Sequence, residues 1–72
     1  MPITDLNLEN WFTYHGPTED QAGKYADIRN AGFAFARLVL RHTPSSADQT
    51  VAIRKIREAV MIANASIACG GK

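Results

Sequence analysis

The chain has 72 residues, 46% of them hydrophobic, which is enough for one domain, residues 1–72, and no more. Its net charge of +1 argues against the broad basic field by which proteins bind a nucleic-acid duplex, and its single cysteine, Cys69, excludes an internal disulfide. A domain of this size buries only about 60% of the surface of its unfolded chain, so we expect self-association to stabilise it.

The first segment, residues 4–13, is expected to form one or two turns of helix, capped by Thr4 or Asp5. Three large apolar side chains of this segment are predicted to pack on the rest of the chain: Leu6, Trp11 and Phe12. The opening residues lack the basic start and apolar run of a signal peptide, and no stretch approaches the roughly 18 apolar residues of a membrane span. We therefore expect a protein without a membrane partner.

The longest helical pattern runs from about residue 19 to residue 42. Thr18 can cap its first turn, and Gln21 can return a hydrogen bond in a capping box. One apolar stripe of this helix is formed by Tyr25, Ile28, Gly32, Phe35 and Val39. A second stripe lies about 100° away and contains Arg29 among the apolar residues Ala22, Ala26, Phe33, Ala36 and Leu40.

A second long helix is expected from about residue 46 to residue 69. Ser46 and Gln49 fit a second capping box, and Gly70 and Gly71 supply the stop. Its apolar stripe is formed by Ile53, Ile56, Val60, Ala63 and Ile67. Two helices of matched length joined by a short turn predict an all-α antiparallel hairpin. Because one partner helix cannot cover both stripes of the first helix, we expect the hairpins to assemble into a helical oligomer.

Nothing in the sequence resembles a catalytic or metal site, so we expect neither an enzyme nor a cofactor. Cys69 has no neighbouring histidine to activate its thiol, and the spacing of the histidines fits no zinc site. Two oppositely charged pairs at a spacing of four are expected to form surface ion pairs: Asp20 with Lys24 and Arg54 with Glu58.

The basic and aromatic residues leave alternatives open. Arg29 is either a residue at the rim of its stripe or a charge that a partner must satisfy. Arg54 and Arg57, with Asn64 two turns beyond Arg57, form either a solvated outward side or a phosphate site, since an arginine fork binds phosphate through two parallel hydrogen bonds. Tyr14 either packs on the first turn of the helix or offers an aromatic face to a nucleobase.

The pattern "YHGPTEDQ...Y..IR.AG..FA", followed by "P.S" and "VAIRKIREAVMIANASIA", resembles the small phage helical-hairpin proteins grouped around anti-CBASS protein two. A similar hairpin forms part of Thoeris anti-defence protein one. The resemblance covers residues 14–69. Its most specific parts are the tyrosine before the cap and the ending "EAVMIANASIA", which is similar to the family's "EAVMWANAAIA" with Ile62 in place of the tryptophan.

The resemblance implies a sponge rather than an enzyme. Such proteins assemble, commonly as hexamers, here expected to be built from dimers. They sequester cyclic di- or trinucleotides without cleaving them, which blocks CBASS-like immune signalling in the cytoplasm of the infected bacterium. The rival functions are a small helical nucleic-acid-binding module and a protein-interaction module.

The resemblance also implies ligand contacts. In the family, a tyrosine before the long helix and a basic residue fifteen positions later contact cyclic dinucleotides. Tyr14 and Arg29 hold these positions here, with arginine in place of the lysine of well-known members. His15 is either a turn residue or part of the same pocket, and the outward polar residues of the second helix are candidates for a separate trinucleotide pocket. The candidate ligand-binding residues are Tyr14, His15, Thr18, Arg29, Arg54, Arg57 and Asn64.

Overall fold

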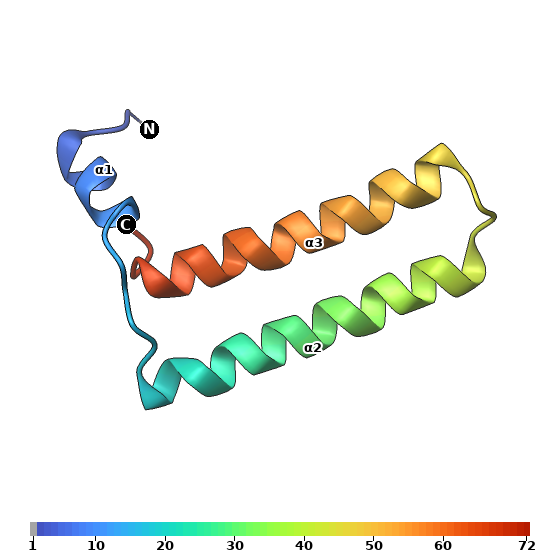
Figure 1. Cartoon of the computed structure of the whole chain (residues 1–72), viewed down its shortest axis with the longest axis horizontal. Coiled ribbons are helices and arrows are strands. Elements are labelled where there is room, and N and C mark those ends of the chain that lie inside the picture. The colour runs from blue at the N-terminus through green and yellow to red at the C-terminus, as the bar shows by residue number, and fades with distance from the viewer. Residues whose placement is uncertain (1) are drawn as a thin grey trace.

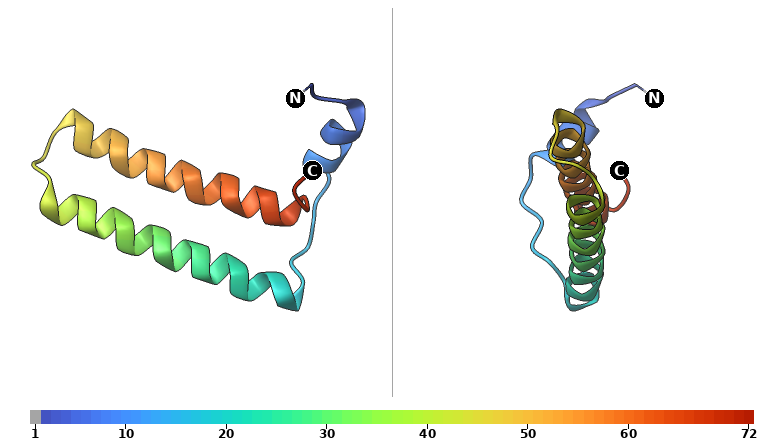
Figure 2. Two further views of the ribbon diagram at one scale, coloured as in Figure 1. Left: turned by 180° about the vertical axis from the view of Figure 1, so that it is seen from behind. Right: turned by 90° about the vertical axis from the view of Figure 1, so that its right-hand side faces the viewer.

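The computed structural model describes residues 2–72, which form three helices joined by two connections (Figure 1). α1 spans Asp5–Trp11, α2 spans Glu19–His42 and α3 spans Ala47–Ala68. α2 and α3 run antiparallel, side by side, and α1 lies at the open end of the hairpin, next to the C-terminal end of α3 (Figures 1 and 2). The predicted all-α hairpin with a short N-terminal helix is confirmed. Across residues 2–72, no helix combines the length and apolar character needed to cross a membrane.

Capping interactions fix the starts of both long helices. Thr18 Oγ1 accepts a hydrogen bond from the Gln21 backbone N–H at 3.3 Å, and Gln21 Oε1 accepts one from the Thr18 N–H at 3.2 Å, which completes the predicted capping box. Ser46 Oγ accepts from the Gln49 N–H at 3.1 Å. The other half of the second box is wrong, because Gln49 Nε2 donates instead to two backbone oxygens at the end of α2, at 3.2 and 3.1 Å. Gln49 therefore bonds the end of α2 to the start of α3.

The C-terminus of α3 ends in a Schellman motif. Gly70 and Gly71 adopt φ values of +65° and +76°, a left-handed conformation that glycine reaches without steric cost. The Gly71 N–H donates to Ser66 O at 2.9 Å, and the Gly70 N–H donates to Ile67 O at 3.2 Å. The predicted glycine stop is confirmed.

Polar side chains attach α1 to the chain that follows α3. Asn7 Nδ2 and Trp11 Nε1 donate to the backbone oxygen of Lys72, at 3.0 and 3.2 Å, and Asn10 Nδ2 donates to Cys69 O at 3.1 Å. These three donors are three and four residues apart and so share one side of α1. They join α1 to the backbone of the four residues that follow α3.

The predicted apolar packing of α1 is wrong for two of its three residues. Leu6 and Phe12 are 76% and 87% exposed, and Trp11 is 43% exposed. The side of α1 that meets the hairpin is the side with the two asparagines, so the apolar side chains on its other sides remain in contact with solvent.

The two predicted stripes close the hairpin. The half-buried members are Tyr25, Ile28, Gly32 and Val39 of α2 and Ile53, Ile56, Val60, Ala63 and Ile67 of α3. Phe35, at the edge of the α2 stripe, is 57% exposed. The helices approach each other closely at Gly32, where an added β-carbon would overlap the Cγ2 methyl of Val60.

The hairpin has no core of its own, since no residue in the range 2–72 is buried. Its accessible surface is 5958 Å², whereas a compact monomer of 7.9 kDa exposes about 4,400 Å². Its Cα radius of gyration is 15.2 Å, against about 11 Å for a compact chain of this length. The chain therefore carries about 1,500 Å² more surface than a self-contained domain of its mass.

Candidate functional site

The strap, residues 12–18, connects α1 to α2 across the open end of the hairpin (Figure 1). Tyr14 lies in the strap and is 88% exposed. Its ring lies near Gly16: a β-carbon added to Gly16 would be 3.8 Å from Tyr14 Cε1, an ordinary van der Waals distance. The Tyr14 ring can thus stack on a flat ligand without displacing any packed side chain.

His15 and Thr18, the other predicted site residues in the strap, already have structural partners. His15 is half-buried, and its Nε2 donates to Asn10 O at 2.7 Å. Thr18 uses its hydroxyl oxygen to cap α2. These contacts hold the strap on both sides of Tyr14 and assign His15 a role in the turn.

The other four predicted site residues lie on one side of the hairpin, which we call the arginine face. It comprises Arg29, Phe33, Ala36 and Leu40 of α2 and Arg54, Arg57, Met61 and Asn64 of α3. Within each helix these residues are three or four apart and so share one side. The two sets meet on the same side of the hairpin, because Phe33 lines a groove of about 240 Å³ together with Arg57 and Met61. Leu40 lines a second groove with Arg54 and Arg57.

Arg29 and Asn64 lie at nearly the same level along the hairpin. The contact of Gly32 with Val60 fixes the register of the two antiparallel helices. Measured along the helix axis, Arg29 lies three residues, or about 4.5 Å, from Gly32, toward the open end of the hairpin. Asn64 lies four residues, or about 6 Å, from Val60 in the same direction. Arg57 lies about 4.5 Å from Val60 in the opposite direction. The arginine face therefore presents Arg29 and Arg57 about 9 Å apart along its length.

Asn64 does not point outward as the sequence suggested. It is half-buried, and its Oδ1 atom is buried without a hydrogen-bond partner among residues 2–72. Such groups in native proteins nearly always have a partner, from protein or from water. Asn64 thus supplies a buried, unused acceptor at about the level of Arg29 along the hairpin.

The arginine face has no carboxylates to neutralise it. None of the residues that line its grooves is acidic. In the range 2–72 the one ion pair joins Lys55 to Glu58, at 3.7 Å. The expected pairs of Asp20 with Lys24 and of Arg54 with Glu58 are therefore wrong, since Glu58 pairs with the lysine one turn before it rather than with Arg54. Arg54 remains available to an anion.

A further arginine lies at the edge of this face. The guanidinium carbon of Arg37 sits 4.4 Å from the centroid of the Phe33 ring, a cation–π contact between residues four apart on α2. Neither residue of this pair is among the predicted site residues, although its spacing is visible in the sequence. Phe33 is 60% exposed, so the stacked pair forms part of the accessible surface.

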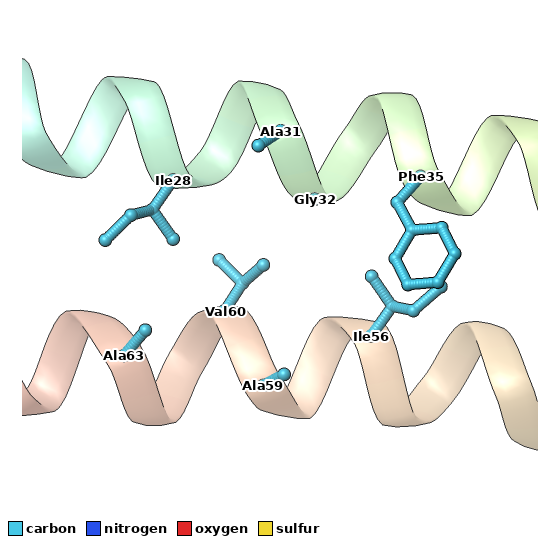
Figure 3. Close-up of a pocket in the computed structure, with 8 residues that line it drawn as sticks. All are labelled: Ile28, Ala31, Gly32, Phe35, Ile56, Ala59, Val60 and Ala63. Atoms are coloured by element: carbon cyan, nitrogen blue, oxygen red, sulfur yellow. The ribbon is translucent and has the colours of Figure 1, made fainter.

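The opposite side of the hairpin, the alanine face, is apolar. A groove of about 350 Å³ lies there, in the close-up of Figure 3. Its lining residues are Ile28, Ala31, Gly32, Phe35, Ile56, Ala59, Val60 and Ala63. No charged or polar side chain lines this groove. The hairpin thus has two unlike faces, one apolar and one lined by arginines.

Tyr14 and Arg29 of one chain are not brought together. The strap crosses the end of the hairpin and does not fold back along α2 (Figures 1 and 2). Arg29 lies ten residues into α2, about 15 Å from the first residue of that helix. A ligand that touches both side chains of one chain would have to span this distance.

These features define a small helical-hairpin domain in which both faces are open to partners. The chain belongs to the Acb2/Tad1 hairpin-domain family, because the family model described as "Acb2/Tad1, hairpin domain" matches residues 4–68. The match includes α1 as well as the hairpin, and it confirms the predicted family. No curated protein and no solved structure gives a significant match. Membership of the family is consistent with a phage anti-defence sponge.

Proposed function

We propose that this protein is a phage anti-defence sponge that binds cyclic oligonucleotide second messengers in the cytoplasm of the infected bacterium. By holding the messengers it keeps CBASS-like immune effectors silent. The observation that carries this proposal is the arginine face, where Arg54 and Arg57 line grooves without a carboxylate beside exposed apolar side chains, and Arg29 lies on the same side of the hairpin. Small anionic ligands with flat bases suit such a surface, because arginine binds phosphate and apolar side chains contact bases.

The proposed contacts divide between phosphates and bases. Arg29 binds a phosphate through its guanidinium fork, and Tyr14 of another chain stacks on a base. A cyclic dinucleotide has two phosphates and two bases, so a two-fold interface that supplies one tyrosine and one arginine from each side matches it. A cyclic trinucleotide would bind separately, at Arg54, Arg57 and Asn64.

Self-assembly is part of the proposal. The surface excess of about 1,500 Å² per chain is close to twice the 800 Å² or so that one partner contributes to a standard interface. Each chain therefore has surface for two neighbours, one on the arginine face and one on the alanine face. Two different interfaces per chain are what a closed hexamer built from dimers requires.

The ligand is proposed to leave the protein unchanged. The Cys69 thiol lies at the end of α3, and the imidazole of His15 donates to a backbone oxygen, so these two groups do not form a pair of nucleophile and base. Sequestration needs only affinity and a sufficient concentration of sites. We therefore class the protein as a binding protein and not as an enzyme.

The test is a binding panel with cyclic diguanylate, cyclic guanylate–adenylate and cyclic triadenylate, measured by calorimetry and thermal melting. At a free ligand concentration of one hundred times the Kd, binding stabilises the folded state by about 2.7 kcal/mol. Chromatography of the ligand released by heating should return it intact. A linear dinucleotide and random duplex DNA serve as controls. If no cyclic nucleotide shifts the melting curve the sponge proposal fails, and a shift with duplex DNA alone favours the nucleic-acid-binding rival.

A further inference from the structure

The strap is held at both ends by the same turn of α3. We propose that this turn positions Tyr14 for its ligand, and that Asn10, His15 and Gln21 are the positioning residues. The expected effect on ligand affinity rests on the proposed function, whereas the expected effect on the mobility of the Tyr14 ring in the free protein does not.

The first attachment runs through Asn10. Its side-chain Nδ2 donates to Cys69 O at 3.1 Å, and its backbone oxygen accepts from His15 Nε2 at 2.7 Å. Asn10 therefore connects the residue next to Tyr14 to the C-terminal end of α3. Both Asn10 and His15 are half-buried, so these hydrogen bonds are partly shielded from competing water.

The second attachment runs through Gln21. Its Oε1 accepts from the Thr18 N–H at 3.2 Å, and its Nε2 donates to Ile67 O at 3.4 Å. The last residue of the strap is thus connected to a backbone oxygen only two residues from Cys69. Both attachments end on backbone oxygens at the C-terminal end of α3, that of Ile67 in its last turn and that of Cys69 at its C-cap.

Tyr14 depends on these attachments because its side chain has few contacts of its own. At 88% exposure, its ring is placed mainly by the backbone that carries it. A binding group already ordered in the free protein avoids the entropy cost of being ordered by the ligand, which for one side chain and its loop corresponds to about three- to tenfold in Kd. The attachments of the strap would supply that ordering before the ligand arrives.

The first test measures the free protein. Asn10→Asp keeps the size of the side chain and removes the donor to Cys69 O. His15→Ala removes the hydrogen bond from the imidazole to Asn10 O. Nuclear magnetic resonance of ring-labelled tyrosine should show Tyr14 more mobile in both variants, with Tyr25 unchanged, and His15→Gln should restore order because its amide can donate. The matched control is Gln49→Ala, which loses two hydrogen bonds at the closed end of the hairpin. Unchanged Tyr14 mobility in both variants would overturn the proposal.

The second test is a double-mutant cycle with cyclic diguanylate, or with whichever cyclic nucleotide of the panel binds. Asn10→Asp should raise the Kd about three- to tenfold in the wild-type background and leave it unchanged in the Tyr14→Ala background, since a residue that acts through Tyr14 has nothing left to position. An equal loss in both backgrounds contradicts positioning and assigns Asn10 a general structural role. If no ligand of the panel binds, the proposed function fails, and the mobility of Tyr14 alone decides this inference.

Discussion

Gly32 of α2 lies so close to Val60 of α3 that a β-carbon on Gly32 would overlap the Cγ2 methyl of Val60. A valine in a helix has one strongly preferred χ1 rotamer, so its methyl group cannot turn away at low cost. The contact sets the separation of the helices and their register. Because the register decides which residues of the two helices lie opposite each other, the contact also fixes the positions of Arg29 and Asn64 along the hairpin.

The first prediction concerns this contact. Gly32→Ala should destabilise the protein by about 1–2 kcal/mol net, since the steric overlap outweighs the gain in helix propensity. Gly23→Ala is the matched control, because Gly23 lies in the same helix with nothing within 4 Å of an added β-carbon. That variant should be more stable by about 0.5–1 kcal/mol. Urea unfolding at one fixed protein concentration measures both, and a Gly32→Ala protein as stable as Gly23→Ala contradicts the close approach.

The second prediction concerns the two faces. Phe33 on the arginine face and Phe35 on the alanine face are 60% and 57% exposed in the single hairpin. Phe33→Glu and Phe35→Glu should each place a charge in one of two different interfaces, which costs far more buried than exposed. Each variant should give a smaller particle than wild type by light scattering. Val51→Glu is the control, since Val51 is similarly exposed, at 52%, and lines neither face's grooves. Wild-type mass in both phenylalanine variants would rule out assembly through these faces.

Local signals explain how much of the fold could be predicted. The cap at Thr18 and the glycines after α3 each act within a few residues, so the sequence alone placed them correctly. The side chain of Gln49 could not be placed, because its partners belong to the end of the preceding helix and depend on how the turn folds. The direction in which α1 packs was missed for a related reason. Its asparagines bond backbone oxygens at the far end of the chain, and hydrophobic periodicity does not report such contacts.

The site shows the same division. Arg29 could be singled out because a charge inside an apolar stripe is visible from periodicity. That Arg54, Arg57 and Asn64 share its side of the hairpin depends on how the two helices face each other, which the groove lined by residues of both helices shows. The attachment of the strap to α3 also depends on contacts between residues distant in sequence, although the spacing of Asn7, Asn10 and Trp11 on one side of α1 was an available signal.

The third prediction concerns stacking on Tyr14. Tyr14→Ala should weaken binding of a cyclic dinucleotide by about 1–3 kcal/mol, the usual contribution of an aromatic side chain stacked on a base. Tyr14→Phe keeps the ring and should bind nearly as well as wild type. Phe12→Ala is the control, because Phe12 lies in the same strap and, at 87%, is as exposed as Tyr14. Calorimetry measures all three, and the stacking role is excluded when Tyr14→Ala binds like Phe12→Ala.

The fourth prediction concerns the charge of Arg29. Arg29→Ala should raise the Kd for a cyclic dinucleotide about ten- to a hundredfold, because a hydrogen bond to a charged group contributes about 1.5–3 kcal/mol. Arg29→Lys should recover part of this loss, since lysine keeps the charge but not the planar fork. Arg41→Ala is the matched control. Arg41 lies in the last turn of the same helix, outside the arginine face. The affinity of wild type should also fall with added salt more steeply than that of Arg29→Ala, as expected when one phosphate contact is lost. If Arg29→Ala and Arg41→Ala weaken binding equally, the effect is that of net charge and Arg29 makes no specific phosphate contact.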